Sequence, residues 1–382
     1  MSQAKKIRVA VLYGGRSGEH EVSLSSATNV IQQLDRDLFD VVPIGIDKEG
    51  VWFLGDDVFK KELSAPAQIR LTRDRERMLF NPDSIGKQTQ HITSSQVKNP
   101  ERIFDVIFPM IHGTLCEDGT VQGFLELANV PYVGCGVLSS AIGMEKDISK
   151  RLIRDAGIHV APYLVINQGQ WNRNPIDFCE KITEKLPFPV FVKPANTGSS
   201  VGVEKVKKAE ELIAAINNAF QYDTKVIVEQ GIDAIELEVA VLESQHDGAD
   251  PIVSTVGEVR PRHEFYSYAA KYLDENGAEL LIPAEISETL HEQVRENAKI
   301  IFNTLECEGM ARVDLFLERG TNKIYFNEVN TIPGFTQISM YPKLMSASGV
   351  GYSELLTHLI MLAIARHSRK TKLSREYVAN SG

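Results

Sequence analysis

The segment from Met310 to Thr336 constrains the fold of this chain more than any other part of the sequence. Two apolar runs, M-A-R-V-D-L-F-L-E and K-I-Y-F-N-E-V-N, flank the short polar turn 319–322. Apolar runs joined by so short a turn predict a β-hairpin. Charged and amide side chains interrupt both runs at positions where a plain core strand would not carry them. The hairpin is therefore a candidate for a functional element.

Three of these polar residues predict a metal site. Glu328 and Asn330 are two residues apart, so both side chains point to one face of a strand. If Asp314 on the partner strand faces the same way, three oxygen donors converge. Few protein ligands, mostly carboxylate, are what Mg²⁺ held against nucleotide phosphates requires. The alternative is a hairpin whose polar residues only face water.

Length, composition and charge limit the class of protein. A chain of 382 residues suggests two or three domains, and 43% hydrophobic with 24% charged residues is ordinary for a globular protein. The net charge of −10 argues against a nucleic-acid-binding surface. The four cysteines form no C-x-x-C pair, which fits a reducing cytosol without a zinc or disulfide framework. We expect no signal peptide and no membrane span, because the apolar runs are too short.

The first third of the sequence predicts a parallel sheet. A strand at 7–13, a helix at about 23–34 and a strand at 41–46 form a βαβ unit. Residues 55–100 are polar and poorly periodic, and they are interpreted as an insertion or as a pair of surface strands. A long helix is predicted over 137–156.

The remaining sequence predicts two further units. The second has helices near 175–185 and 209–220, and its strands lie near 161–166, 189–192, 203–206 and 225–229. The third contains the hairpin, a helix at about 287–305 and a terminal helix near 353–366.

The loop from Asn196 to Gly202 is a candidate anion site. Its glycines permit close approach of backbone N–H groups, and Ser199 and Ser200 add hydroxyl donors. Lys193 ends the apolar run before this loop and offers a point charge for phosphate. The spacing is not that of a P-loop, and the alternatives are a plain turn and a lysine that reaches solvent.

Two loops of the first unit carry further candidates. His112 follows a buried strand, where α/β sheets place ligand loops, and it could orient a carboxylate or carry a proton. Glu19 precedes the first helix and could receive an ammonium group. The alternatives are a structural histidine and a capped helix start. No G-x-G-x-x-G is present, so a dinucleotide site is poorly supported.

The tyrosine-rich loop from Glu264 to Tyr272 is a candidate lid. Aromatic residues in a polar loop can exclude water from a site, and a surface hairpin is the alternative.

Five motifs occur in an order that resembles the D-alanine–D-alanine ligases, an ATP-grasp family of bacterial cell-wall synthesis. They are G-G-R-S-G-E-H-E-V-S-L, H-G-T-L-C-E-D-G-T-V-Q-G, V-K-P-A-N-T-G-S-S-V-G, Y-A-A-K-Y, and M-A-R-V-D-L-F with N-E-V-N-T-I-P-G-F-T. The resemblance spans nearly the whole chain. One departure is Cys116, which stands where the family usually has glycine and would be strained if that position has a positive φ.

The resemblance implies an α/β fold of three domains, an ATP-grasp fold preceded by a Rossmann-like domain with a parallel sheet. The domains would cover 1–145 (first D-alanine), 146–233 (small ATP-grasp domain) and 234–382 (metal site and mobile loop). The implied reaction joins two D-alanines through D-alanyl phosphate, using ATP and two Mg²⁺ or Mn²⁺ ions, in a cytoplasmic homodimer. A D-alanine–D-lactate ligase or another carboxylate–amine ligase is the alternative, and a nucleotide-binding regulatory subunit without turnover is the alternative outside enzymes.

The resemblance also implies roles for individual residues. Glu19, near His112, would bind the ammonium of the first D-alanine, and Tyr272 would join Ser199 and Glu19 in a hydrogen-bonded triad. Tyr272 is replaced in related ligases that make D-alanyl-D-lactate, so its presence favours an amine nucleophile. The residues implied for the nucleotide are Lys146, Lys193, Ser199, Ser200, Glu229, Glu236 and Lys271. Those implied for the metals are Asp314, Glu328 and Asn330. Those implied for the second D-alanine and the oxyanion are Arg312, Gly334 and Ser339.

Overall fold

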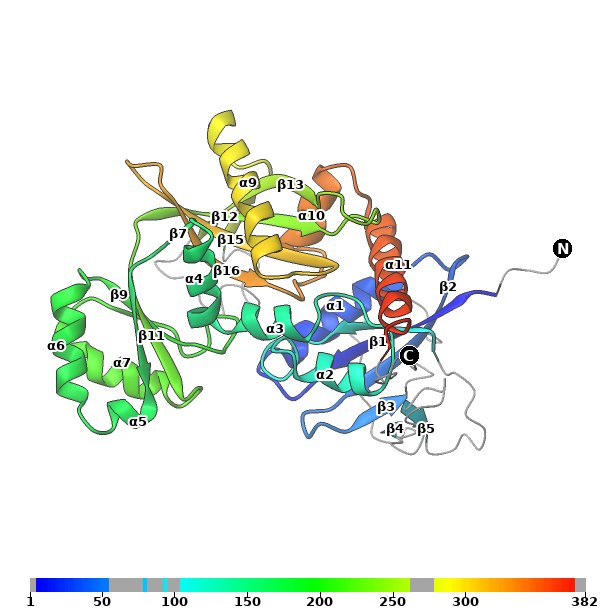
Figure 1. Cartoon of the computed structure of the whole chain (residues 1–382), viewed down its shortest axis with the longest axis horizontal. Coiled ribbons are helices and arrows are strands. Elements are labelled where there is room, and N and C mark those ends of the chain that lie inside the picture. Colours follow the sequence, from blue (N-terminus) through cyan, green and yellow to red (C-terminus); the bar gives the residue numbers. More distant parts are fainter. Residues whose placement is uncertain (1–4, 55–77, 81–91, 95–103, 262–277, 375–382) are drawn as a thin grey trace, which may run out of the picture.

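The computed structural model describes residues 5–54, 78–80, 92–94, 104–261 and 278–374, and every structural statement below concerns these residues. They form three main sheets and one two-stranded pair. Figure 1 shows a lobe around β9 and β11 at one end, a sheet containing β12, β13, β15 and β16 in the middle, and the sheet of β1 and β2 at the other end.

The N-terminal sheet is parallel at its centre. β1 (Ile7–Gly14) lies between β2 (Phe39–Ile46) and β6 (Val106–Met110) and pairs in parallel with both. β3 (Trp52–Leu54) adds an antiparallel edge. Residues 9–13 are buried, as expected for a parallel strand that is covered on both faces. The predicted parallel sheet is therefore confirmed.

The structure gives a different start for the first helix and shows two strands within residues 55–100. α1 (His20–Gln33) begins earlier than the predicted position 23, and it buries Ala27, Val30 and Ile31. Within 55–100, β4 (Met78–Phe80) and β5 (Ile92–Ser94) form an antiparallel pair, as in the second of the two interpretations given above.

The helix predicted over 137–156 is two helices. α2 (Thr120–Leu127) precedes α3 (Val137–Met144), and α4 (Lys146–Asp155) follows after Glu145, whose backbone is extended. The break has a tertiary cause: the Lys146 N–H donates to the carbonyl of Ala195 in the central lobe at 3.0 Å. A continuous helix would use that donor internally, so the prediction of one helix was wrong.

The central sheet is antiparallel, in the order β10-β9-β11-β8. The helix α6 (Pro175–Lys185) is capped by the Asn174 side chain, which accepts the Asp177 N–H, and Pro175 occupies its first position. The strands are β8 (Tyr163–Asn167), β9 (Val190–Pro194), β10 (Glu204–Val206) and β11 (Lys225–Gln230). The helices are α5 (Gln168–Trp171), α6 (Pro175–Lys185), the 3₁₀ helix η2 (Ala209–Glu211) and α7 (Leu212–Ala219).

The third sheet has the order β14-β13-β12-β15-β16-β7, and all its pairs are antiparallel except β16–β7. Its strands are β7 (His159–Val160), β12 (Ala234–Leu242), β13 (Ile252–Pro261), β14 (Ala278–Leu281), β15 (Met310–Glu318) and β16 (Ile324–Asn330). The last two strands are the predicted hairpin, which is confirmed.

Helices cover both faces of the third sheet. α9 (Glu288–Thr304), capped by the Ser287 side chain, packs Val294, Ala298 and Ile301 on one face. α10 (Met340–Ala347) and α11 (Tyr352–Lys370) belong to a second core cluster that also contains residues of α1 and β1. This shared core joins the N-terminal sheet to the third sheet.

One observation concerns membranes. Among the described residues no single helix is both long and apolar enough to cross a bilayer, although α10 and α11, bent by 104°, pass that test together by length and composition.

Candidate active site

The hairpin brings its predicted polar residues together. Asp314 lies opposite Glu328, and Arg312 lies opposite Asn330, across the β15–β16 pair. The Asn330 Nδ2 donates to Asp314 Oδ2 at 3.0 Å. The register shifts between Asp314 and Leu315, so the hairpin has an irregularity beside these side chains. The convergence expected from the two-residue spacing is therefore present.

Arg312 links this cluster to the neighbouring strand β12. Its guanidinium donates to both oxygens of Asp314 at 2.7 Å and lies 3.0 Å from Glu238 Oε2 on β12. Two parallel bonds of this kind fix a carboxylate more firmly than a single contact. Glu238 was missed by the sequence reasoning, although the i, i+2 pattern E-L-E at 236–238 marks two acids on one strand face.

Lys146 connects the hairpin to the glycine- and serine-rich loop. Its Nζ lies 3.6 Å from Glu328 Oε2 and donates to the Thr197 carbonyl at 2.5 Å. The lysine is buried, so its charge lies in a medium where it acts strongly on a nearby anion. The acids of the candidate metal site and the candidate anion loop therefore share one cation.

The loop 196–202 has an unusual backbone. Ser199 and Ser200 have φ values of 50° and 59°, which non-glycine residues rarely adopt. The left-handed conformation costs such residues about 1–2 kcal/mol each. Strain of this kind is concentrated at ligand-binding positions, so the loop conformation agrees with the predicted anion site.

Glu19 lies between the N-terminal sheet and this loop. It is buried at the start of α1 and makes no side-chain cap. A Cβ built on Gly198 would lie 2.9 Å from Glu19 Oε1, and one built on Gly113 would lie 3.2 Å away. Both glycines are needed for this close approach. Glu19 is thus brought next to the serine loop, as the predicted triad requires.

His112 joins the N-terminal sheet to the segment after the hairpin. Its Nδ1 lies 3.2 Å from both Glu117 Oε1 and the Ile332 carbonyl, and its Nε2 lies 3.1 Å from Ser26 Oγ. Two acceptors at Nδ1 require the proton on that nitrogen. Burial lowers the pKa of His112, but the hydrogen bond and charge of Glu117, with the Glu19 charge and the Ile332 carbonyl, together outweigh burial and raise the pKa. Ser26, which also accepts the Phe335 N–H, was missed by the sequence reasoning.

Cys116 does not have the backbone strain that a positive φ at this position would cause. Among the non-glycine residues of this loop the positive φ belongs to Leu115, at 67°, and Cys116 is not among the described residues with positive φ. The thiol is buried, and a Cβ built on Gly15 would lie 3.2 Å from its Sγ. Burial, with the charges of Glu117, Asp118 and Glu19, raises the pKa of the thiol and keeps it protonated.

A buried cluster of two lysines and one glutamate lies beside the hairpin. Lys193 Nζ and Lys150 Nζ each lie 2.6 Å from one oxygen of Glu229. Burial raises the pKa of Glu229, but the two lysines outweigh burial and lower the pKa to about 2. Burial lowers the pKa of Lys193, but Glu229, with smaller contributions from Glu328 and Glu236, outweighs burial and raises it. Lys150 was missed, although its i, i+4 spacing from Lys146 places both on one face of a helix.

The remaining predicted residues divide into two groups. Gly334 and Ser339 lie together after β16: a Cβ built on Gly334 would lie 2.8 Å from Ser339 Oγ, which accepts the Thr336 N–H at 2.9 Å. Lys271 and Tyr272, like the rest of the proposed lid from Glu264, lie outside the described residues.

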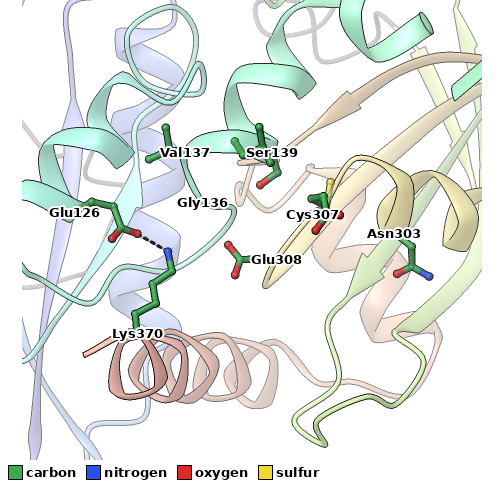
Figure 2. Close-up of a pocket in the computed structure, with 10 residues that line it drawn as sticks. Glu126, Gly136, Val137, Ser139, Asn303, Cys307, Glu308 and Lys370 are labelled. Carbon is green, nitrogen blue, oxygen red and sulfur yellow. Dashed lines mark hydrogen bonds and ion pairs between the residues drawn. The ribbon is translucent and has the colours of Figure 1, made fainter. Parts of the chain in front are cut away.

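A cavity of about 500 Å³ lies elsewhere, between the start of α3, the end of α9 and the end of α11. Figure 2 shows Glu126 paired with Lys370 on one side and Glu308 and Cys307 on another. None of the predicted site residues that the structure describes lines this cavity. The candidate active site is therefore the region around the hairpin and not this cavity.

Comparisons with known proteins agree with this geometry. A model of the D-ala D-ala ligase N-terminus matches residues 8–135, and one of the D-ala D-ala ligase C-terminus matches 152–361. D-alanine--D-alanine ligase A of Bradyrhizobium diazoefficiens is 50% identical over 378 residues, covering 98% of this chain and 100% of that protein.

Solved structures extend the comparison to the fold. The D-alanine-D-alanine ligase from Coxiella burnetii has a TM-score of 0.83 at 35% identity, and 97% of each chain is covered. The VanG D-Ala:D-Ser ligase from Enterococcus faecalis has a TM-score of 0.78 at 35% identity, covering 94% of this chain and 100% of that one. The fold is thus the α/β ATP-grasp arrangement with three sheets. With both family models and these relatives matching along nearly its whole length, the chain belongs to the D-alanine–D-alanine ligase family.

Proposed function

We propose that this protein joins two D-alanines to D-alanyl-D-alanine, with ATP converted to ADP and phosphate, as a step in peptidoglycan precursor synthesis. One observation carries the proposal: Lys146 touches both Glu328 of the hairpin and Thr197 of the serine loop, while Glu19 lies against Gly198 of the same loop. An acid suited to an ammonium group, an anion loop and a set of oxygen ligands therefore meet in one place.

The first D-alanine binds at Glu19. The buried carboxylate receives the substrate ammonium, and His112 with its proton on Nδ1 stays hydrogen-bonded to Ile332 and Glu117 beside it. This leaves the substrate carboxylate directed toward the serine loop, where the γ-phosphoryl group is transferred. Ser199 and Tyr272 complete a hydrogen-bonded triad with Glu19.

The nucleotide binds between the central lobe and the hairpin. Lys146, Lys193 and Lys271 offset the charge of the phosphates, and Ser199 and Ser200 line the phosphate loop. Glu229 and Glu236 contact the adenine and ribose. The deep burial of Glu229 supports its place at the base end of the nucleotide.

Asp314, Glu328 and Asn330 hold two Mg²⁺ or Mn²⁺ ions. Their donor set is oxygen only and mostly carboxylate, which fits a hard divalent cation. The Asp314 carboxylate already accepts from the Arg312 guanidinium through both oxygens, and this affinity for a cation supports the role proposed for it. Divalent ions held by these residues would stabilise the charge of the transferring phosphoryl group.

The second D-alanine attacks the acylphosphate through its amine. Arg312 stabilises the oxyanion of the tetrahedral intermediate, together with backbone N–H groups near Gly334. Ser339, fixed by Thr336, orients the second substrate. Water must be excluded because the acylphosphate hydrolyses, and the loop from Glu264 to Tyr272 serves as the lid.

The organisation of the protein is part of the proposal. Domains cover 1–145, 146–233 and 234–382, and the helix break at Glu145 supports the first division. We further propose a cytoplasmic homodimer, as the family membership implies.

A ligase that uses a different second substrate is the alternative function, favoured by the similarity to the D-Ala:D-Ser ligase. ADP release should be measured with purified protein, Mg²⁺ and ATP, with D-alanine, D-serine, D-lactate and L-alanine supplied side by side. We expect D-alanine alone to give rapid turnover, with the dipeptide identified by mass spectrometry. Release that requires D-serine or D-lactate as a second substrate would favour the alternative, and ATP binding without dipeptide would favour a regulatory subunit.

A further inference from the structure

Lys150 is the most deeply buried charged side chain of the nucleotide region, with a side-chain exposure of 0%. It extends from α4 and reaches Glu229 on β11 at 2.6 Å. It also donates to the carbonyls of Asn327, at 3.2 Å, and Phe326, at 3.4 Å, on β16. A lysine ammonium has three donors, so all of them are used. These contacts hold the Lys150 ammonium in one position.

Lys193 is held less firmly than Lys150. Its ammonium donates to the other oxygen of Glu229 at 2.6 Å, and its side chain is 13% exposed. It lies 5.8 Å from the Phe191 ring, a weak additional attraction. Of the two lysines on Glu229, Lys193 is therefore the one that can turn toward a phosphate.

If Lys193 turned toward a phosphate, Glu229 would lose one of its two counter-ions. A buried carboxylate that loses its counter-ion is strongly destabilised. Lys150, Lys193 and Glu229 together carry one more cation than anion, and the Glu236 and Glu328 carboxylates act on Lys193 from outside this set. One lysine can leave while the other still neutralises Glu229. The second lysine is thus available to pair with an incoming polyanion such as a nucleoside triphosphate.

We propose that Lys150 is a positioning residue for nucleotide binding: it stays on Glu229 as a permanent counter-ion, so that Lys193 can exchange Glu229 for a phosphate oxygen. Lys150 does not itself touch the nucleotide. It keeps Glu229 charged and oriented throughout. The inference rests on the proposed function, because the polyanion is taken to be ATP.

The test replaces Lys150 with methionine, which keeps an unbranched side chain one atom shorter and removes the charge. Lys193 then becomes the only lysine left on Glu229, and binding a phosphate must break that pair. The KM for ATP is expected to rise about tenfold or more, with a smaller change in kcat and little change in the KM for D-alanine. Direct titration with Mg–ATP should show the same loss of affinity. Lys181→Met, in an exposed pair with Asp177 on α6, is the control and should change nothing.

A second variant separates the proposed role from a folding defect. Lys150→Met combined with Glu229→Gln removes both charges, so no buried carboxylate is left without its partner. In the Glu229→Gln background, adding Lys150→Met is expected to change the affinity for ATP by less than about twofold. An ATP affinity that Lys150→Met leaves at the wild-type value would overturn the proposal, as would effects of the two changes that simply add.

Failure of the proposed function gives a different result. If the wild-type protein makes no dipeptide, the titration with Mg–ATP still compares the variants. Loss of affinity in Lys150→Met would then support the role of Lys150 in binding a nucleotide that serves another reaction.

Discussion

The Arg312–Asp314–Asn330 cluster and the Lys150–Glu229–Lys193 cluster both place charges in the interior, but they are assembled differently. In the first, the contacts join residues two or sixteen positions apart on one hairpin. In the second, three elements contribute, and the contacts join residues 79 and 36 positions apart. The first is set by strand register and the second by the packing of α4 on two sheets. Substitutions in the first cluster should therefore change mainly the rate of turnover. Substitutions in the second should also change the free energy of unfolding.

The largest expected effect is that of Arg312→Ala. Loss of one oxyanion donor typically reduces the rate by about 10²–10³, and the variant should show at least that loss in D-alanine-dependent ADP release. The hairpin should persist because its backbone pairs do not depend on this side chain. Circular dichroism checks the fold. Near-normal turnover would refute the role given to Arg312.

A smaller loss is expected for Glu328→Gln. The amide keeps the shape but removes a charge, so turnover at limiting Mg²⁺ should fall roughly 10–100-fold and recover in part at high Mg²⁺. The measurement is a Mg²⁺ titration of ADP release. A loss of stability without any change in the Mg²⁺ requirement would restore the interpretation of a hairpin that only faces water.

The second cluster predicts a pH dependence of stability. The pKa of Glu229 falls from 4.5 to about 2 on folding because Lys150 and Lys193 outweigh burial. Since the folded pKa is the lower one, this stabilisation is complete above about pH 4.5 and is lost as the pH falls toward 2. It is at most about 3 kcal/mol.

Glu229→Gln tests this dependence. The difference between wild type and variant in the free energy of unfolding, measured in urea, should shrink as the pH falls from about 7 to about 3. A difference that stays constant with pH would show that Glu229 contributes no linked protonation.

The smallest expected effect is a change of product. Tyr272→Phe should let D-lactate compete with D-alanine as nucleophile, while dipeptide synthesis continues. Mass spectrometry of products from equimolar D-alanine and D-lactate measures this. An unchanged product spectrum would count against the role that the family resemblance gives to Tyr272.

The same contrast explains what the sequence could predict. Asp314, Glu328 and Asn330 could be found because strand periodicity alone aligns them. Ser26 could not be singled out, since its partners are distant in the chain: Ser26 Oγ meets His112 and the Phe335 N–H. The spacing of Lys150 from Lys146 marked a shared helix face but not the contact with Glu229, 79 positions away. The single helix predicted over 137–156 failed for a related reason, because the Lys146 N–H bonds to Ala195 in another sheet. Local patterns carry no information about such contacts.

The arrangement of the lobes has a consequence for the catalytic cycle. The helices and strands of the central lobe make their main contacts with one another, whereas α11 packs on both α1 and β6. The N-terminal and C-terminal parts thus share one core. The central lobe is joined to them by several polar contacts, among them Lys225 with Glu145 and Asp147. Lys146 also bonds to the Ala195 and Thr197 carbonyls, and Lys150 pairs with Glu229. We expect the N-terminal and C-terminal parts to keep a constant separation during turnover, while the central lobe moves relative to them as the nucleotide enters and leaves.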